Sequence, residues 1–190
     1  MSRIRRADAL ANRERVVAAA RETFAAAGVG APMREVARRA GIGVATLYRH
    51  FPTRDDLVGA VLARQVDECG RQMRAAISDT DPWRGLAGII RGFAERQIHD
   101  RALNEVLLGS GSAAAVFREQ RLEHSRSLNT LVERARRAGA LRAGVDADDV
   151  RAGLLGIASL RQLPPERSAA VITKLGDVIL AGLRGDTRTP

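Results

Sequence analysis

The sequence contains very few cysteine, lysine and aromatic residues. Its lone cysteine, Cys69, excludes an intramolecular disulfide and fits a reducing compartment such as the cytoplasm. Of 31 basic residues, only Lys174 is a lysine. Because this bias runs through the whole chain, it indicates genome composition more than recognition. Aromatic residues make up 3% of the chain, and no segment alternates apolar and polar residues for the length of a strand. We therefore predict an all-α protein.

Long apolar segments are also absent. The longest run without a charge, Val106–Phe117, is interrupted by glycines and falls short of the about 20 residues that span a bilayer. The N-terminal MSRIRR is basic, but no apolar segment follows it, so we expect no export signal and a cytoplasmic protein. A length of 190 residues is enough for one small and one medium helical domain.

Patterns typical of enzymes and of metal or cofactor sites are missing as well. The chain has no nucleophile with a base at useful spacing, no glycine-rich cofactor loop and no paired carboxylates. The GSGS run at Gly109–Ser112 lacks a nucleotide-binding context and favours a helix break. His99 and His124 lie far apart in sequence, without a carboxylate or cysteine at ligand spacing. We expect neither an enzyme nor a bound metal or cofactor.

The segment Pro32–Phe51 has the pattern of two short helices joined by a tight turn. Pro32 suits the first position of a helix, and Gly41 supplies a left-handed residue that ends the first helix. The small Ala37 lies where the two helices would cross, and Pro52 stops the second helix. This spacing is typical of a helix-turn-helix, whose second helix enters the major groove of DNA.

Groups that bind phosphate or base edges occupy the outward face of the second helix. Thr46 and Tyr48 carry hydroxyls, and Arg49 and His50 carry nitrogen donors. Gly43 leaves the backbone N–H groups at the helix start uncovered. These residues alone fit equally well a small amphipathic hairpin whose polar face is only solvated.

Two longer segments carry a family resemblance. RVVAAARETFAAAG (Arg15–Gly28) and MREVARRAGIGVATLYRHFPTRDDLVGAVL (Met33–Leu62) resemble the N-terminal domain of the TetR/AcrR transcriptional regulators. The resemblance implies a three-helix DNA-binding domain at residues 9–67 and an effector-binding and dimerisation domain at 68–190. The chain departs from the family pattern at Gly43, where serine is usual, at Ala45, where glycine is common, and at Ala31-Pro32, where threonine is common.

The resemblance also implies which side chains meet DNA. The predicted contacts come from the helix-turn-helix and from the start of the fourth helix: Arg34, Gly43, Val44, Ala45, Thr46, Tyr48, Arg49, His50, Thr53 and Arg54. Thr53 and Asp56 have the spacing of a capping box. Beside them, Arg54 either reaches a phosphate or is solvated.

Positive charge concentrates in the same part of the chain. Residues 1–64 hold 12 arginines and 6 acids, which is +6 of the chain's net +9. Such a footprint favours nucleic-acid binding. We expect the first helix to begin near Arg13. Arg3, Arg5 and Arg6 then form a flexible arm that either contacts DNA or only solubilises the protein.

Helices also fill the rest of the sequence. They cover about 82–98, with Asp81 as the cap, then 102–108 and 113–138, a helix capped by Asp146 through Asp149, and a final helix from 165 to about 183. The last two have apolar stripes, and in the family the corresponding pair forms a homodimer. The family also implies an effector pocket, for which the candidate lining residues are Trp83, Phe93, Gln97, His99, Leu103, Leu107, Phe117, His124 and Leu128. Their mostly apolar character suggests a hydrophobic or aromatic small molecule.

The predicted function is therefore a dimeric transcriptional regulator that reads a palindromic operator on double-stranded DNA. Two recognition helices held about 34–36 Å apart would read its two half-sites. We expect a repressor released by a small-molecule effector. An activator, or an architectural DNA binder without an effector, stays open as the alternative.

Overall fold

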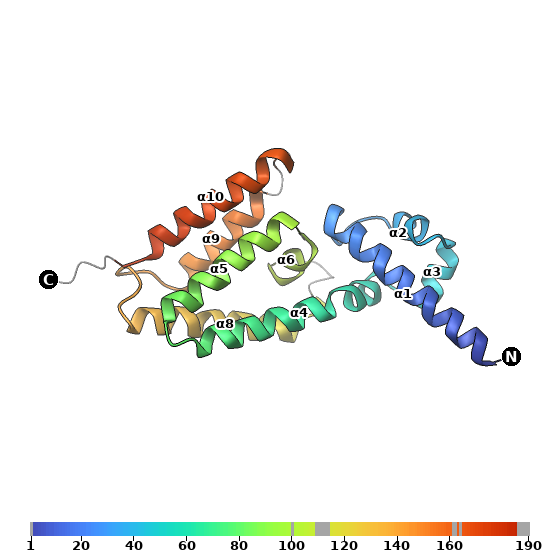
Figure 1. The fold of residues 1–190 in the computed structure, drawn as a ribbon, viewed down its shortest axis with the longest axis horizontal. Coiled ribbons are helices and arrows are strands. Elements are labelled where there is room, and N and C mark those ends of the chain that lie inside the picture. Colours follow the sequence, from blue (N-terminus) through green and yellow to red (C-terminus); the bar gives the residue numbers. More distant parts are fainter. Residues whose placement is uncertain (1, 100, 109–114, 161–162, 164, 186–190) are drawn as a thin grey trace. The chain divides into compact units, whose positions relative to one another are not determined.

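The structure is a computed structural model that describes residues 2–99, 101–108, 115–160, 163 and 165–185. The regular structure of these residues is helical, apart from one isolated bridge between Leu141 and Arg184, which confirms the all-α prediction. No helix in these ranges is long and apolar enough to cross a bilayer. The helices labelled in Figure 1 are α1 (Ser2–Ala27), α2 (Met33–Ala40), α3 (Val44–His50), α4 (Arg54–Ser78), α5 (Pro82–His99), α6 (Arg101–Leu108), α8 (Arg118–Arg137), α9 (Ala147–Ser159) and α10 (Pro165–Leu183).

The first compact unit combines residues 1–65 with a later segment, residues 100–117. Its core is formed by apolar side chains of α1 to α4, among them Phe24, Val36, Leu47 and Leu57, all with no exposed surface. Because α6 packs against α1, the later segment is part of this unit. Helix α4 supplies its first residues to this unit and its remaining residues to the second.

Helix α1 begins at Ser2, so the prediction of a helix start near Arg13 is wrong. Arg3, Arg5 and Arg6 belong to the helix and do not form a flexible arm ahead of it. Residues 2–12 contain neither glycine nor proline, so nothing in this stretch stops the helix from extending towards the N-terminus.

The helix boundaries in this unit follow from special residues at the turns. Gly28 (φ 80°) ends α1 and Gly41 (φ 68°) ends α2, both in the left-handed region that favours glycine. Pro32 is the N-cap of α2 and lies just outside the helix. At the start of α4 the capping box is confirmed, since the Thr53 N–H donates to Asp56 Oδ2 (3.0 Å) and the Asp56 N–H donates to Thr53 Oγ1 (3.1 Å).

The second unit combines residues 66–99 and 118–190. Helix α5 packs against α8, α9 and α10, and α9 and α10 lie side by side (Figure 1). Fully buried side chains of Leu86, Ile90, Leu131 and Ile157 form its core. A capping box between Asp146 and Asp149 starts α9, which confirms the acidic cap predicted there.

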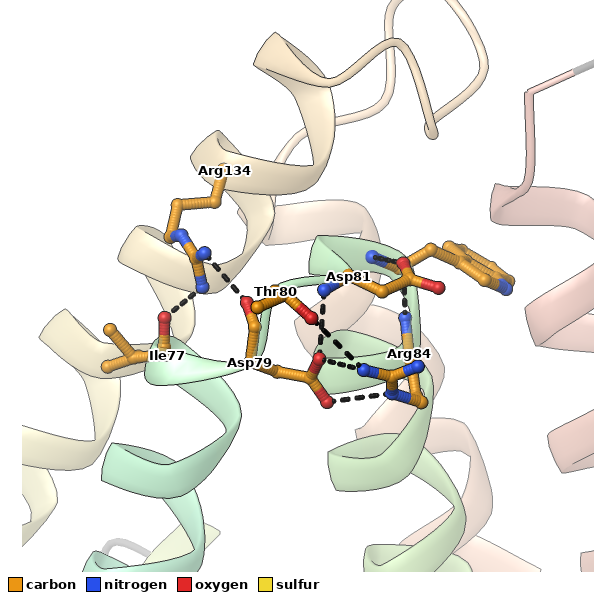
Figure 2. Close-up of polar contacts among 7 residues, drawn as sticks. Ile77, Asp79, Thr80, Asp81, Arg84 and Arg134 are labelled. Atoms are coloured by element: carbon orange, nitrogen blue, oxygen red, sulfur yellow. Dashed lines mark hydrogen bonds and ion pairs between the residues drawn. The ribbon is translucent and has the colours of Figure 1, made fainter.

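Charged side chains organise the turn between α4 and α5 (Figure 2). Arg134 of α8 donates to the backbone carbonyls of Ile77 and Asp79, so it caps the end of α4. Arg84 donates to the Asp79 carboxylate through Nε (2.9 Å) and Nη2 (2.5 Å). Asp81 accepts from the backbone N–H groups at the start of α5, which confirms its predicted role as a cap.

Candidate nucleic-acid interface

Buried residues fix the rotation of α3. Leu47 has no exposed surface and Phe51, just after the helix, is 2% exposed. Both lie on the inner side of the helix. Helix α2 packs on α3, and its Val36 and Ala37 are also buried. Ala37 is 1% exposed, as expected for a small residue where two helices cross. The opposite side of α3 therefore faces away from the core.

That outward side carries polar and small residues. Tyr48 is 45% exposed and Arg49 is also exposed, while Thr46 and His50 are half-buried. Arg49 Nη2 donates to Thr46 Oγ1 at 2.8 Å, which holds the guanidinium along the helix surface. A guanidinium held in this way has lost rotamer freedom before any ligand arrives.

Arginines of α2 differ in whether they are already paired. Arg38 forms an ion pair with Glu35 (2.6 Å), which lowers the pKa of the Glu35 carboxyl and raises the pKa of Arg38. Arg39 forms an ion pair with Glu22 of α1 (3.1 Å). Arg34 is exposed and has no such partner among the described residues. Within α2, Arg34 therefore has the guanidinium most available to an outside anion.

Residues at the start of α4 are engaged within the protein. The Thr53 hydroxyl takes part in the capping box with Asp56. Arg54 is half-buried, and its Nη1 donates to the carbonyl oxygens of Val29 (2.8 Å) and Ala31 (2.5 Å). This contact joins positions 25 and 23 residues apart in sequence. No short-range sequence pattern predicts these hydrogen bonds. For this reason the sequence alone indicates only a phosphate or solvent as the partner of Arg54.

A second contact that the sequence did not indicate lies at the end of α3. The Arg13 guanidinium of α1 stands 5.0 Å from the centre of the Phe51 ring. Phe51 is a core residue, and its ring also contacts the Arg13 guanidinium of α1. The contact ties the C-terminal end of α3 to α1.

The residues predicted to contact DNA thus all belong to the first unit. On its surface they divide by exposure. Exposed are Arg34, Gly43, Val44, Ala45, Tyr48, Arg49 and Thr53, and half-buried are Thr46, His50 and Arg54. The arrangement offers hydroxyl and guanidinium groups on a short helix with an apolar inner side. Chemically, such a surface can donate hydrogen bonds to phosphates and base edges.

The residues predicted to line an effector pocket divide between the two units. Leu103 and Phe117 belong to the first unit, and Trp83, Phe93, Gln97, His124 and Leu128 belong to the second. The side chains of His99 and Leu107 lie outside the described residues.

Their local environments differ. The side chains of Phe93, Leu103, Phe117 and Leu128 are buried. Arg184 stands 5.5 Å from the centre of the half-buried Trp83 ring.

Two of these candidates are polar groups within the helical packing. Gln97 is 4% exposed and donates through Nε2 to the carbonyl of Ala158 (3.3 Å). His124 Nδ1 lies 2.6 Å from the carbonyl oxygen of Gln120, and its buried Nε2 has no hydrogen-bond partner among the described residues. No three potential metal ligands gather in the described part of the chain.

Two open hollows lie elsewhere in the second unit. One of about 480 Å³ is bordered by α8 and by residues 144–147, and one of about 380 Å³ is bordered by residues 142–145 and by α9 and α10. None of the predicted effector residues whose side chains the structure describes lines either hollow.

Comparisons with known proteins match both parts of the chain. Residues 16–61 match the model of bacterial regulatory proteins of the tetR family, and residues 81–185 match the model of the C-terminal domain of SbtR-like transcriptional regulators. An HTH-type transcriptional regulator of Staphylococcus aureus is 41% identical over 63 residues, 33% of this chain and 34% of that protein. The match thus spans about a third of the length of these curated relatives.

Solved structures resemble nearly the whole chain. A TetR transcription regulatory protein from Mycobacterium vanbaalenii is 36% identical, with 94% of this chain and 98% of that chain covered and a TM-score of 0.55. SmeT, described as the repressor of a multidrug efflux pump of Stenotrophomonas maltophilia, is 25% identical, with 92% and 91% covered and a TM-score of 0.64. KstR2 of Mycobacterium tuberculosis, at 21% identity and a TM-score of 0.69 with 92% and 95% covered, shares the fold.

Proposed function

Because the chain belongs to the TetR family of bacterial transcriptional regulators, we propose that it is a dimeric repressor released from a palindromic operator by a small-molecule effector. It would act in the bacterial cytoplasm, where the DNA is. Regulators of this family bind DNA and are not enzymes.

One observation carries the DNA-binding part of the proposal. Helix α3 buries Leu47 and turns Tyr48 and Arg49 outward, on a unit with an excess of positive charge. In a helix-turn-helix the second helix lies in the major groove. Tyr48 would then donate to a phosphate, and Arg49 would meet a phosphate or a guanine edge. Arg34 at the start of α2 would add a phosphate contact.

Exposed apolar residues support a homodimer through α9 and α10. Leu155 of α9 and Val178 of α10 are 53% and 58% exposed, and Val171 is 39% exposed. A second copy would cover these side chains in an isologous interface. Gly153 of α9 has a role within one chain and not in the proposed dimer interface. An added Cβ there would lie 3.2 Å from Ile179 of the same chain, so this glycine permits close packing of α9 on α10.

The effector part of the proposal rests on the family and on the candidate lining residues. SmeT, at 25% identity, is described as a repressor, which supports repression as the direction of control. Buried Phe93, Gln97 and Leu128 would suit a mostly apolar ligand with one polar anchor. In one conformer of the dimer the recognition helices would not be positioned to fit the operator. An effector that binds this conformer more tightly would lower operator affinity by its difference in binding free energy between the two conformers.

The experiment begins with selection of duplexes from random DNA by the full-length protein. Binding of the selected duplex is then measured by fluorescence anisotropy at several salt concentrations. Tyr48→Ala should raise Kd by about tenfold, as expected for the loss of a hydrogen bond to a charged group. If Arg49 contacts a phosphate, Arg49→Ala should lower the slope of log K against log salt by about 0.9. If it contacts a base, the variant should instead relax sequence preference.

Arg91→Ala is the matched control, because Arg91 is an exposed arginine of α5 in the other unit. It should leave both Kd and the salt slope unchanged. Failure to enrich any palindromic sequence, or unchanged binding by both α3 variants, would refute the proposal. A compound panel screened by thermal shift and then by release of the duplex tests the effector part separately.

A further inference from the structure

The turn between α1 and α2 is held from two sides by charged side chains that are distant in sequence. On one side, Arg54 of α4 donates through Nη1 to the carbonyl oxygens of Val29 and Ala31, at 2.8 and 2.5 Å. On the other side, Glu105 of α6 accepts a hydrogen bond from the Val29 N–H, with Oε2 3.4 Å from the nitrogen. The N–H and the C=O of one residue, Val29, are thus both bound by charged groups from other helices.

Gly28 makes room for this arrangement. A Cβ at residue 28 would lie 2.5 Å from Glu105 Oε2, and φ there is +80°. The backbone conformation favours glycine here, and a Cβ would also displace the Glu105 carboxylate from this position. The turn itself is largely shielded from water, since Val29 is 6% exposed and Ala31 4%. Hydrogen bonds in such a place are stronger than on an open surface, and leaving a donor unpaired is costly.

The turn lies directly upstream of the DNA-reading helices. Ala31 is followed by Pro32 and α2, and α2 packs on both α1 and α3. A displacement of residues 28–31 would therefore be passed to α3 through α2. Glu105 comes from residues 100–117, which follow α5 in sequence but pack into the first unit. Through Glu105, helix α6, which follows α5 in sequence, contacts the α1–α2 turn that orients α2.

We propose that Arg54 and Glu105 act together as positioning residues on the α1–α2 turn, and that Glu105 is the contact through which α6 regulates operator binding. Arg54 then supports α2 from within the protein and is not a phosphate contact. The regulatory half of this inference rests on the proposed DNA-binding function. The positioning half does not, because it concerns the free protein.

Hydrogen exchange of the free protein tests the positioning half. Glu105→Ala should speed exchange of the Val29 amide by about tenfold, read from peptides that cover residues 24–31. Glu105→Gln keeps an acceptor oxygen and should restore most of the protection. Glu95→Ala is the matched control, since Glu95 is an exposed glutamate of α5, and it should leave these peptides unchanged. Unchanged exchange at residue 29 in Glu105→Ala would overturn this half.

The salt dependence of duplex binding tests Arg54. In Arg54→Ala, the slope of log K against log salt should match the wild type, with Kd raised by the misplaced helix. A slope lowered by about 0.9, as expected for a lost phosphate contact, would overturn the assignment. The variant Arg54→Lys keeps the charge but loses the planar donor geometry that reaches two carbonyls. Hydrogen exchange of the free Arg54→Lys protein can therefore separate an effect on folding from an effect on DNA binding.

Linkage tests the regulatory half without a known effector. If Glu105 connects α6 to the reading helices, duplex binding must in turn change hydrogen exchange in residues 101–108. We expect such a change in the wild type and its loss in Glu105→Ala. An identical α6 signal with and without duplex, or a change that persists in the variant, would overturn the regulatory half. If the wild type binds no duplex at all, the proposed function and this regulatory role fail together, and the Val29 exchange still decides whether the turn is held as described.

Discussion

Gly43 offers a test of how the start of α3 is stabilised. It is the N-cap of this helix, and being glycine it has no side chain that could cap the first backbone N–H groups. Its backbone has φ −70° and ψ 147°, an extended conformation open to any residue, and a Cβ there would meet nothing within 4 Å. Serine should therefore fit without strain, and its hydroxyl should accept a hydrogen bond from the N–H two or three residues on.

The magnitude follows from two small terms. A serine cap in place of glycine adds a few tenths of a kcal/mol, and the loss of glycine's freedom in the unfolded chain adds ~0.4–1 kcal/mol. We expect Gly43→Ser to raise the free energy of unfolding by about 1 kcal/mol, or the Tm by about 2–4 °C in a chain of this size. Gly43→Ala gains the entropy term but provides no cap, so it should be less stable than Gly43→Ser by about 1 kcal/mol.

The assay is urea unfolding followed by far-UV circular dichroism. Gly41→Ser is the matched control, two residues away. Gly41 has φ +68°, so the same substitution there should lower the free energy of unfolding by about 1 kcal/mol. The reasoning fails if Gly43→Ser is no more stable than Gly43→Ala. It also fails if the serine variants at 41 and 43 shift stability in the same direction.

Further predictions concern the second unit. Gly85→Ala should destabilise by about 1–3 kcal/mol, because the new Cβ would lie 2.5 Å from a backbone carbonyl oxygen of α4, whereas Gly88→Ala meets open space and should be neutral or stabilising by thermal unfolding. The hydrogen bonds from Arg84 lower the pKa of Asp79, so the stability it contributes is complete above the unfolded pKa near 3.8 and is lost as the pH falls below it. Asp79→Asn should flatten the pH dependence of urea stability as the pH falls below about 3.8, and an unaltered pH profile would contradict this. Val178→Glu places a charge on a 58% exposed apolar position, so light scattering should detect monomers if α10 forms the dimer.

The helix-turn-helix could be read from the sequence because its signals are local. Gly41 and Pro32 mark the helix ends through their own backbone preferences, and the one-turn spacing of Leu47 and Phe51 identifies the inner side. Once that side is known, the outward position of Tyr48 follows from helix geometry. The capping boxes at the starts of α4 and α9 were likewise predictable, since their partners are three residues apart.

Contacts made across long stretches of sequence could not be predicted. Arg54 was expected to face phosphate or solvent, but its partners are carbonyls 23 and 25 residues upstream. Glu105 meets the N–H of a residue 76 positions earlier, and no periodicity encodes such a pairing. The start of α1 was missed for another reason. The cluster of arginines at positions 3, 5 and 6 suggests an arm, but Ser2 to Asn12 contains neither glycine nor proline to stop a helix.

The return of residues 100–117 to the first unit has a consequence for synthesis on the ribosome. Residues 1–65 emerge first, but α6 becomes available to cover α1 only after roughly 35 to 50 more residues have been added. At about 5–20 residues per second this delay lasts some seconds, during which the α1 surface beneath α6 stays uncovered. A fragment cut after residue 65 would keep that surface bare permanently, so truncation there should yield an aggregation-prone polypeptide.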